Sequence, residues 1–586
     1  MSLLRALERG AWIRSVDLAL ARSLRRAREE TPDLVLAAAA LASRAVANGH
    51  SQLPMALVRE LLLEVAGDRE LPELPPLEEW LEVLRASPWT STPAIASESC
   101  VMVLDGEALS LRRYWQYEAR LAAAISSRLA GPQPAQDSDA LAQRIAVLFT
   151  AADGSVDQAQ ADAARAALSK RFLLLTGGPG TGKTTTVART LVLFAEHFAR
   201  ANGDRAPRIL LAAPTGKAAA RLAESVRENL AQLLADGLID ARLAQSLPGE
   251  ASTLHRLLGW RRGSVDFRHD AARPLLADLV IVDEASMIDL PLMCKLLEAV
   301  PPAATLVLIG DRDQLPSVET GDVLAALCDA GAAPTSLLAG HRAHLSRSHR
   351  QAGDIDVAAL AALVRDGDGD AALEGLRSDR FRGVAWQRGS DRALAEAVLE
   401  QALPAYRALQ SAADVQAALA AAKRFRVLTA VREGGAGSQR LNGLIASALD
   451  PTRRGDGFFS GRLVLVIENS YRHQLFNGDI GVVWPDEYGE QRVWFDAEGG
   501  PRAWLPAALP AHESAFALTV HKSQGSEFER VFLALPEQGS RVVSRELLYT
   551  GLTRCRREVT LWANDAVLRE GIARKAQRWS GLAQRL

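Results

Sequence analysis

The sequence predicts an α/β fold in which two parallel-sheet domains follow a helical N-terminal domain. Three observations predict it. A glycine-rich loop at Gly177–Thr184 directly follows a short apolar run, strand-length apolar runs alternate with helical patterns on both sides of that loop, and the first 130 residues are rich in Ala and Leu at helical spacing. The length of 586 residues suits roughly three or four domains.

The N-terminal region, residues 1–130, is predicted to be a mainly helical domain. Its amphipathic stretches are interrupted by a proline-rich segment at Leu71–Pro76. The string Gly131-Pro132-Gln133-Pro134-Ala135-Gln136-Asp137-Ser138 then ends the helical pattern and is typical of a linker.

Residues 139–345 are predicted to form the first α/β domain. Short apolar runs alternate there with helical patterns, which indicates buried parallel strands covered by helices. The expected strands are Leu173–Leu175, Ile209–Ala212, Leu279–Val282 and Leu306–Ile309.

The glycine-rich loop matches the pattern G-x-x-x-x-G-K-[ST] without a gap. Glycines let backbone N–H groups converge on phosphate oxygens at a helix N-terminus. Lys183 places a positive charge toward the β- and γ-phosphates, and the Thr184 hydroxyl suits a magnesium ion. The loop therefore predicts binding of a nucleoside triphosphate, ATP, with Mg²⁺. The expected nucleotide ligands are Gly177, Gly178, Pro179, Gly180, Thr181, Gly182, Lys183, Thr184 and Thr185.

Polar residues follow two further strands of this domain. Asp283 and Glu284 end one strand, where Asp283 would hold the magnesium shell and Glu284 would act as general base toward the attacking water. Gln314, in the string that begins at Gly310, would reach the γ-phosphate and report its loss.

Residues 346–586 are predicted to form the second α/β domain. Its expected strands are Val427–Leu428, Phe516–Val520, Val531–Leu535 and Val559–Trp562. Residues 461–511 have short β-type runs between Asn-Gly and Gly-Glu turns, which predicts a small β-barrel-like (SH3-like) insertion. Two domains that bind one nucleotide between them can close when its γ-phosphate is present and open when it leaves. This requires arginines supplied by the domain opposite the phosphate loop. Arg350 and Arg554 are the candidates.

Composition narrows the environment of the protein. The four cysteines lack metal-ligand spacing, which favours a reducing compartment. Neither a membrane-spanning stretch nor a signal-peptide core is evident, so we expect a cytoplasmic protein that does not associate with membranes. The net charge of −2 leaves nucleic-acid binding open.

Several strings together resemble the ordered motifs of superfamily 1 helicases, and within group 1B those of the RecD family. They are Gly177–Thr184, Ala213–Ala219, Asp283–Met287, Gly310–Leu315, His521–Phe528 and Tyr549–Arg554, with Arg112–Trp115 and Phe476–Gly481 also fitting. The resemblance covers roughly Gln158 to Arg557.

The resemblance implies two RecA-like lobes, ATP-driven 5′→3′ translocation on single-stranded DNA, and unwinding of duplex ends. It implies that Gln160 reads adenine, although Gln158 competes for that role. It also implies a DNA groove lined by Pro214, Thr215, Lys217, Thr253, His255, Thr519, His521, Lys522 and Ser523.

The resemblance further implies a heterotrimer with RecB and RecC, the exonuclease V assembly of double-strand break repair by homologous recombination, with the N-terminal domain docking on RecC. Two alternatives stay open. One is a stand-alone RecD2-like helicase, which should carry helix-hairpin-helix repeats that are not evident in the sequence. The other is an ATPase switch that binds DNA without unwinding it.

Overall fold

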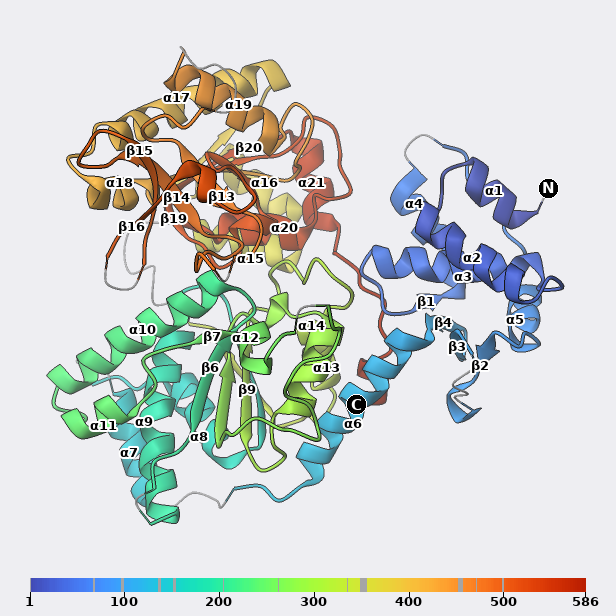
Figure 1. The fold of residues 1–586 in the computed structure, drawn as a ribbon, viewed down its shortest axis with the longest axis horizontal. Coiled ribbons are helices and arrows are strands. Elements are labelled where there is room, and N and C mark those ends of the chain that lie inside the picture. Colours follow the sequence, from blue (N-terminus) through green and yellow to red (C-terminus); the bar gives the residue numbers. More distant parts are fainter. Residues whose placement is uncertain are drawn as a thin grey trace.

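The computed structural model describes residues 2–66, 69–95, 100–134, 139–150, 154–203, 205–261, 263–334, 336–347, 356–451, 457–470, 472–497 and 500–586. Figure 1 shows two α/β lobes lying against each other, with the N-terminal part of the chain beside them. The first lobe is built on strands β5–β10 and the second on β11, β12 and β18–β20.

The first lobe is a six-stranded, all-parallel sheet in the order β10-β5-β9-β8-β6-β7. The strands are β5 (Phe172–Gly177), β6 (Ile209–Ala213), β7 (Ser252–Thr253), β8 (Leu279–Val282), β9 (Thr305–Gly310) and β10 (Arg342–Leu345). Alternate side chains of β5 enter two cores, Phe172 and Leu174 on one face and Leu173 and Leu175 on the other. Burial on both faces explains why the strand is apolar throughout.

Helices cover both faces of this sheet. They are α7 (Asp139–Phe149), α8 (Gln158–Ser169), α9 (Lys183–Ala201), α10 (Gly216–Ala235), α11 (Ala241–Ser246), α12 (Leu254–Leu258), α13 (Leu290–Ala299) and α14 (Val323–Ala330). Because β5, β9 and β8 are neighbours and parallel, the segments that follow them meet at one sheet edge.

The second lobe has a five-stranded parallel sheet in the order β11-β20-β19-β12-β18. Its strands are β11 (Val384–Gln387), β12 (Phe425–Thr429), β18 (Ala517–Thr519), β19 (Phe528–Ala534) and β20 (Cys555–Trp562). The helices are α15 (Val357–Asp366), α16 (Gly369–Arg377), α17 (Asp391–Gln410), α18 (Val415–Ala422), α19 (Ser438–Leu449), α20 (Arg545–Leu552) and α21 (Asp565–Ala573).

The β-rich insertion between β12 and β18 is a five-stranded antiparallel sheet in the order β16-β15-β14-β13-β17. Its strands are β13 (Leu463–Val466), β14 (Ile480–Pro485), β15 (Gln491–Phe495), β16 (Arg502–Trp504) and β17 (His512–Ser514). Alternate residues build a small core of its own around Val464, Val483 and Phe495. In the part of the chain that is described, β16 and β17 are edges, so the sheet is open; its SH3-like character stays a prediction.

The N-terminal part contains the predicted helices and also a small sheet that was not predicted. The helices are α1 (Leu3–Arg9), α2 (Ser15–Ala27), α3 (Asp33–Ala47), α4 (Val58–Ala66), α5 (Leu77–Arg85) and α6 (Arg112–Ala130). The sheet has the order β1-β4-β3-β2, with β1 (Leu53–Pro54), β2 (Thr90–Ser91), β3 (Met102–Asp105) and β4 (Ala108–Leu111). Two residues, Gly106 and Glu107, connect β3 to β4, and Gly106 has a φ of 63°. A glycine at the first position of a two-residue loop between apolar runs is a hairpin signal, so this hairpin could have been predicted.

After α21 the chain leaves the second lobe and packs on the N-terminal part, as the red trace in Figure 1 shows. The Trp579 ring stacks on His50 with centroids 4.0 Å apart, and the Ser51 backbone N–H donates to the Trp579 carbonyl at 2.9 Å. The fully buried carboxylate of Glu118 on α6 accepts from the Ser51 hydroxyl (2.6 Å), the Ser580 hydroxyl (2.7 Å) and the Gly581 N–H (3.1 Å). The C-terminal segment therefore ties the N-terminal part to the two lobes.

Most predicted strands are confirmed to within one or two residues at each end, including the four that were predicted for the first lobe. Among the described residues, no helix combines the length and the apolarity that crossing a bilayer would take.

Replacing Glu118 by Ala should destabilise the junction between the N-terminal part and the lobes. The change leaves several buried donors without their acceptor, a loss of about 3–5 kcal/mol. We expect a lower midpoint of thermal unfolding and faster proteolysis between α6 and the first lobe. Glu107→Ala, at an exposed position in the turn between β3 and β4, is the control. Equal midpoints for both variants and the unmodified protein would show that the junction does not depend on this carboxylate.

Candidate active site

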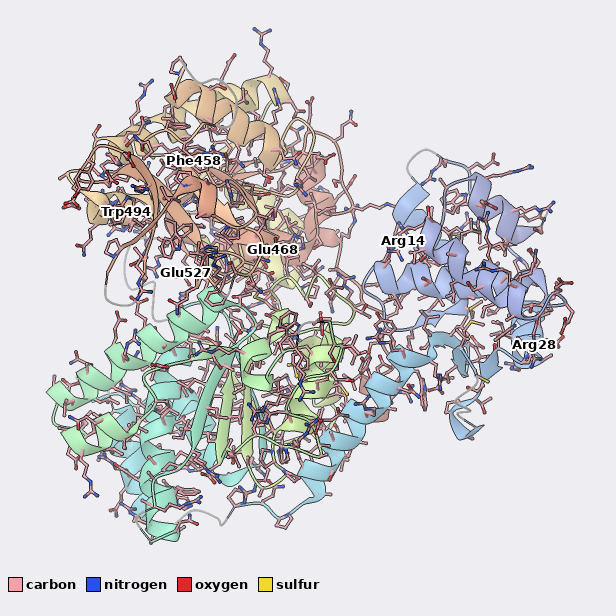
Figure 2. The ribbon with its side chains drawn as sticks, viewed as in Figure 1. Arg14, Arg28, Phe458, Glu468, Trp494 and Glu527 are labelled. Atoms are coloured by element: carbon pink, nitrogen blue, oxygen red, sulfur yellow. The ribbon has the colours of Figure 1, made fainter. Side chains whose placement is uncertain are left out.

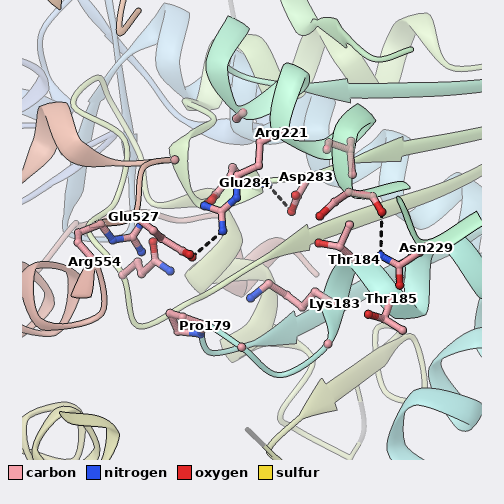
Figure 3. Close-up of a pocket in the computed structure, with 17 residues that line it drawn as sticks. Pro179, Lys183, Thr184, Thr185, Arg221, Asn229, Asp283, Glu284, Glu527 and Arg554 are labelled. Atoms are coloured by element: carbon pink, nitrogen blue, oxygen red, sulfur yellow. Dashed lines mark hydrogen bonds and ion pairs between the residues drawn. The ribbon is translucent and has the colours of Figure 1, made fainter. Parts of the chain in front are cut away.

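A cleft of about 300 Å³ lies where the two lobes meet, at the carboxyl ends of β5, β8 and β9. Figure 3 shows side chains of both lobes pointing into it. The cleft is lined by Pro179, Gly180, Gly182, Lys183, Thr184, Thr185, Asp283, Glu284, Gln314 and Arg554, all predicted from the sequence. Arg221 and Glu527 line it too.

The phosphate loop connects β5 to α9. Gly180 and Gly182 have φ angles of 76° and 81°, a region that L-residues with a side chain rarely adopt. Lys183 begins α9, and its ammonium donates to the carbonyls of Gly177 (2.7 Å) and Gly178 (2.9 Å). The loop thus holds its lysine against its own backbone, beside the N-terminal end of a helix.

Two of the predicted nucleotide ligands, Thr181 and Gln160, lie beneath the loop surface that lines the cleft. The Thr181 hydroxyl is buried and donates to the Gly178 carbonyl at 2.9 Å. Gln160 is also buried, and its side-chain amide donates to the Thr181 carbonyl at 3.4 Å. Gln158 is exposed and donates instead to Asp162. The geometry favours Gln160 over Gln158 as the glutamine associated with the phosphate loop.

Asp283 and Glu284 follow β8 and face the loop. Burial and the adjacent Glu284 carboxylate raise the pKa of Asp283 to about 6, and Lys183 opposes the rise. Glu284 has a φ of 52°, in the left-handed region that non-glycine residues seldom occupy. The strained backbone turns the second carboxylate into the cleft. A hydroxyl from Thr184 and a carboxylate from Asp283 are hard oxygen ligands, which fit the predicted magnesium ion.

Gln314 is joined to the second lobe by hydrogen bonds. Its amide donates to Asp311 at 3.1 Å, and the same carboxylate oxygen accepts from the Tyr549 hydroxyl at 3.0 Å. Next to it, the Leu315 N–H donates to the Thr550 hydroxyl at 2.8 Å, and Gln524 donates to the Leu315 carbonyl at 2.9 Å. A displacement of Gln314 would therefore be transmitted to α20 through Asp311 and Tyr549.

Arg554 enters the cleft from the second lobe. It is 2% exposed, and its guanidinium donates to the carbonyls of Thr550 (3.2 Å) and Ser526 (3.3 Å). Burial lowers the pKa of Arg554, and the nearby Glu284 and Glu527 oppose that change. The other predicted arginine, Arg350, lies outside the described residues.

The predicted DNA-binding residues lie on both lobes near their boundary. Thr215 caps α10, and its hydroxyl accepts from the Ala218 N–H at 3.2 Å. Gly525 follows the His521–Ser523 turn, and a β-carbon added to it would lie 3.7 Å from the Ala218 methyl group. The predicted contacts after β6 and β18 are therefore brought together.

The predicted DNA-binding residues differ in how accessible they are. Burial lowers the pKa of Lys217 to about 7, with Arg426 adding to the change and Asp479 of the insertion opposing it. Lys522 forms an ion pair with Glu513 at 2.6 Å. Ser523 is fully buried, and its hydroxyl donates to the Val520 carbonyl at 2.7 Å. Pro214, Thr253, Thr519 and His521 are partly exposed, and His255 is exposed.

Arg221 and Glu527 were not predicted as site residues. They form an ion pair of 2.6 Å across the cleft, drawn as a dashed line in Figure 3. Arg221 lies four residues after Lys217 on α10, one helical turn along the same face. That spacing from a predicted motif is the signal that could have identified it.

The chain is similar to several known proteins and family profiles. Residues 9–109 match the profile of the RecBCD enzyme subunit RecD, N-terminal domain; residues 160–320 match an AAA domain, and residues 514–562 a UvrD-like helicase C-terminal domain. The RecBCD enzyme subunit RecD of Mycobacterium tuberculosis is 40% identical over 562 residues, which are 95% of this chain and 92% of that protein. The ATP-dependent RecD2 DNA helicase of Deinococcus radiodurans is 34% identical over 395 residues, 66% of this chain and 46% of that protein. Among solved structures, Pif1 helicase from Candida albicans aligns with a TM-score of 0.38 and 16% identity, over 72% of this chain and 97% of that one.

Replacing Arg554 by Ala should leave ATP binding intact and slow ATP turnover by about 10³-fold or more, because an arginine supplied across a cleft stabilises transition-state charge. Steady-state hydrolysis and binding of a fluorescent ATP analogue measure the two effects. For comparison, Lys183→Gln should abolish turnover without loss of folding.

The matched control for Arg554→Ala is Arg557→Ala, at an exposed position three residues away from Arg554. A loss of only twofold for Arg554→Ala would make this arginine a structural charge.

Proposed function

The chain belongs to the RecD family, and from this premise we propose that it is the 5′→3′ motor subunit of a RecBCD-type helicase–nuclease. It is an ATP-dependent DNA helicase of DNA repair. The observation that carries the proposal is the cleft in which Lys183 and Arg554, from different lobes, line one pocket. Such a pocket closes around a triphosphate and opens when the γ-phosphate leaves.

In the proposed mechanism each residue has one task. The phosphate loop and Lys183 hold the β- and γ-phosphates, Thr184 and Asp283 hold Mg²⁺, and Glu284 orients and deprotonates the attacking water. When bound, the magnesium ion neutralises charge that develops on the phosphates. Gln314 reports the γ-phosphate to α20 through Asp311 and Tyr549.

We place single-stranded DNA in the groove that the predicted residues of both lobes form. Hydroxyls, a lysine and backbone N–H groups contact phosphates without reading sequence, as a translocating motor requires. When the lobes move relative to each other, the DNA contacts of the first lobe and those of the second lobe shift in turn. The polarity of movement rests on family membership alone.

We further propose RecB and RecC as partners in a cytoplasmic heterotrimer that acts on DNA ends in recombinational repair. We also propose residues 1–130 as the docking domain on RecC, and 139–345 and 346–573 as the motor domains. The insertion in the second, predicted as 461–511, extends in this proposal to the end of β17 at Ser514. The alignment with the Deinococcus RecD2 helicase leaves more than half of that protein uncovered, whereas the tuberculosis RecD aligns over nearly its whole length. This difference favours the subunit over the stand-alone helicase.

A strand-polarity assay tests the proposed function. The full chain, alone and with RecB- and RecC-type subunits, is given a duplex with either a 5′ or a 3′ single-stranded tail, and displacement is followed with a fluorophore. The proposal expects ATP-dependent displacement from the 5′ tail only and co-purification of the three subunits. DNA-stimulated hydrolysis without displacement or translocation would instead support an ATPase switch.

Replacing His521 and Lys522 together by Ala should weaken single-strand binding and flatten its dependence on salt. Burial lowers the pKa of His521, so only Lys522 is expected to displace a counterion when DNA binds. The loss of Lys522 should therefore lower the slope of log K against log salt concentration by about 0.7. Binding of oligo-dT measured by fluorescence anisotropy at several salt concentrations gives the slope. Lys575→Ala, at an exposed position in the C-terminal segment, is the control. A slope unchanged from the unmodified protein would place the turn off the DNA path.

A further inference from the structure

The ion pair between Arg221 and Glu527 joins two segments that each run from the DNA groove to the nucleotide cleft. Arg221 is on α10, which begins at the predicted DNA contacts Thr215 and Lys217. Glu527 follows the predicted contacts His521–Ser523 by four residues. Figure 2 places Glu527 where the two lobes meet.

The pair is well placed to influence the chemistry of the cleft. The Glu527 side chain is only 7% exposed, and the Arg221 side chain is 35% exposed. Burial disfavours the Arg221 charge, but Glu527, Glu284 and Asp283 outweigh it and raise the pKa of Arg221. Arg221 therefore stays charged and lies within the field of Asp283, the predicted magnesium ligand, and of Glu284, the predicted general base.

The two carboxylate oxygens of Glu527 pair with arginines from different lobes. Oε1 of Glu527 pairs with Arg221 of the first lobe at 2.6 Å, and Oε2 pairs with Arg556 of its own lobe at 2.9 Å. Only the first pair crosses the boundary between the lobes. The Arg556 side chain is 54% exposed and links the carboxylate only to its own lobe, whereas Arg221 makes the position of the carboxylate depend on the other lobe.

We propose that the Arg221–Glu527 ion pair couples the DNA groove to the nucleotide cleft. Single-stranded DNA on the α10 and His521–Ser523 contacts sets the spacing of the two segments, and the pair transmits that spacing to Glu284 and Arg554. Arg221 and Glu527 are positioning residues in this account. The inference rests on the proposed helicase function.

The test compares ATP turnover of the full chain with and without saturating oligo-dT. Arg221→Gln should lower the ratio of stimulated to unstimulated turnover at least about fivefold, the lower end of usual coupling between sites. Glu527→Gln should produce the same defect. The double variant should lower the ratio no further than either single change, because a pair acts as one unit. Arg556→Gln, which removes the partner from the same lobe, should keep the ratio of the unmodified protein.

Three outcomes would overturn the coupling role. A normal ratio in Arg221→Gln, with only the KM for ATP raised, would make Arg221 a nucleotide ligand. A normal ratio with weaker oligo-dT binding would make it a DNA ligand, and additive losses in the double variant would mean two independent roles. If the unmodified chain shows no stimulation by DNA, the proposed helicase function fails instead.

Discussion

The cleft between the lobes gathers charges that balance only when both lobes contribute to it. Three carboxylates, of Asp283, Glu284 and Glu527, are gathered in a space partly withdrawn from water. Carboxylates gathered in one small space repel one another, which raises the free energy of the folded protein unless cations lie close to them. Lys183 and Arg221 come from the first lobe and Arg554 from the second, so neither lobe completes the site alone. In the proposed mechanism, a site divided in this way converts the loss of a phosphate into movement of the lobes.

The β-rich insertion lies against the proposed DNA groove. The Phe476 ring packs so closely on Gly216 that a β-carbon at that position would lie about 3 Å from it. Asp479, three residues later, opposes the loss of the Lys217 charge. The insertion thus contacts the same end of α10 that is expected to bind DNA, and its loop would form part of the wall of the proposed groove.

The sequence predicted best where one local pattern determines the structure. Buried parallel strands are short apolar runs, and the phosphate loop is a contiguous string, so their positions and those cleft residues that lie in such strings could be predicted from the sequence. Strand β10 was missed because it contains Arg342 and His344 and lies at the sheet edge, where a strand need not be apolar. The C-terminal segment was assigned to the second α/β domain, although Trp579 and its neighbours pack on the N-terminal part. Such contacts between distant segments, like the pair of Arg221 with Glu527, leave no periodic pattern in the chain.

The most direct test of the account is the distance between the lobes during a nucleotide cycle. Fluorophores on cysteines introduced at the exposed positions Val147 and Val542 report that distance, since Cys100, Cys294 and Cys328 are buried and Cys555 is partly buried. We expect energy transfer to change when a non-hydrolysable ATP analogue binds, to return with ADP, and to stay constant in Lys183→Gln. Identical transfer in the nucleotide-free, analogue-bound and ADP-bound states would contradict a cleft that closes on the terminal phosphate.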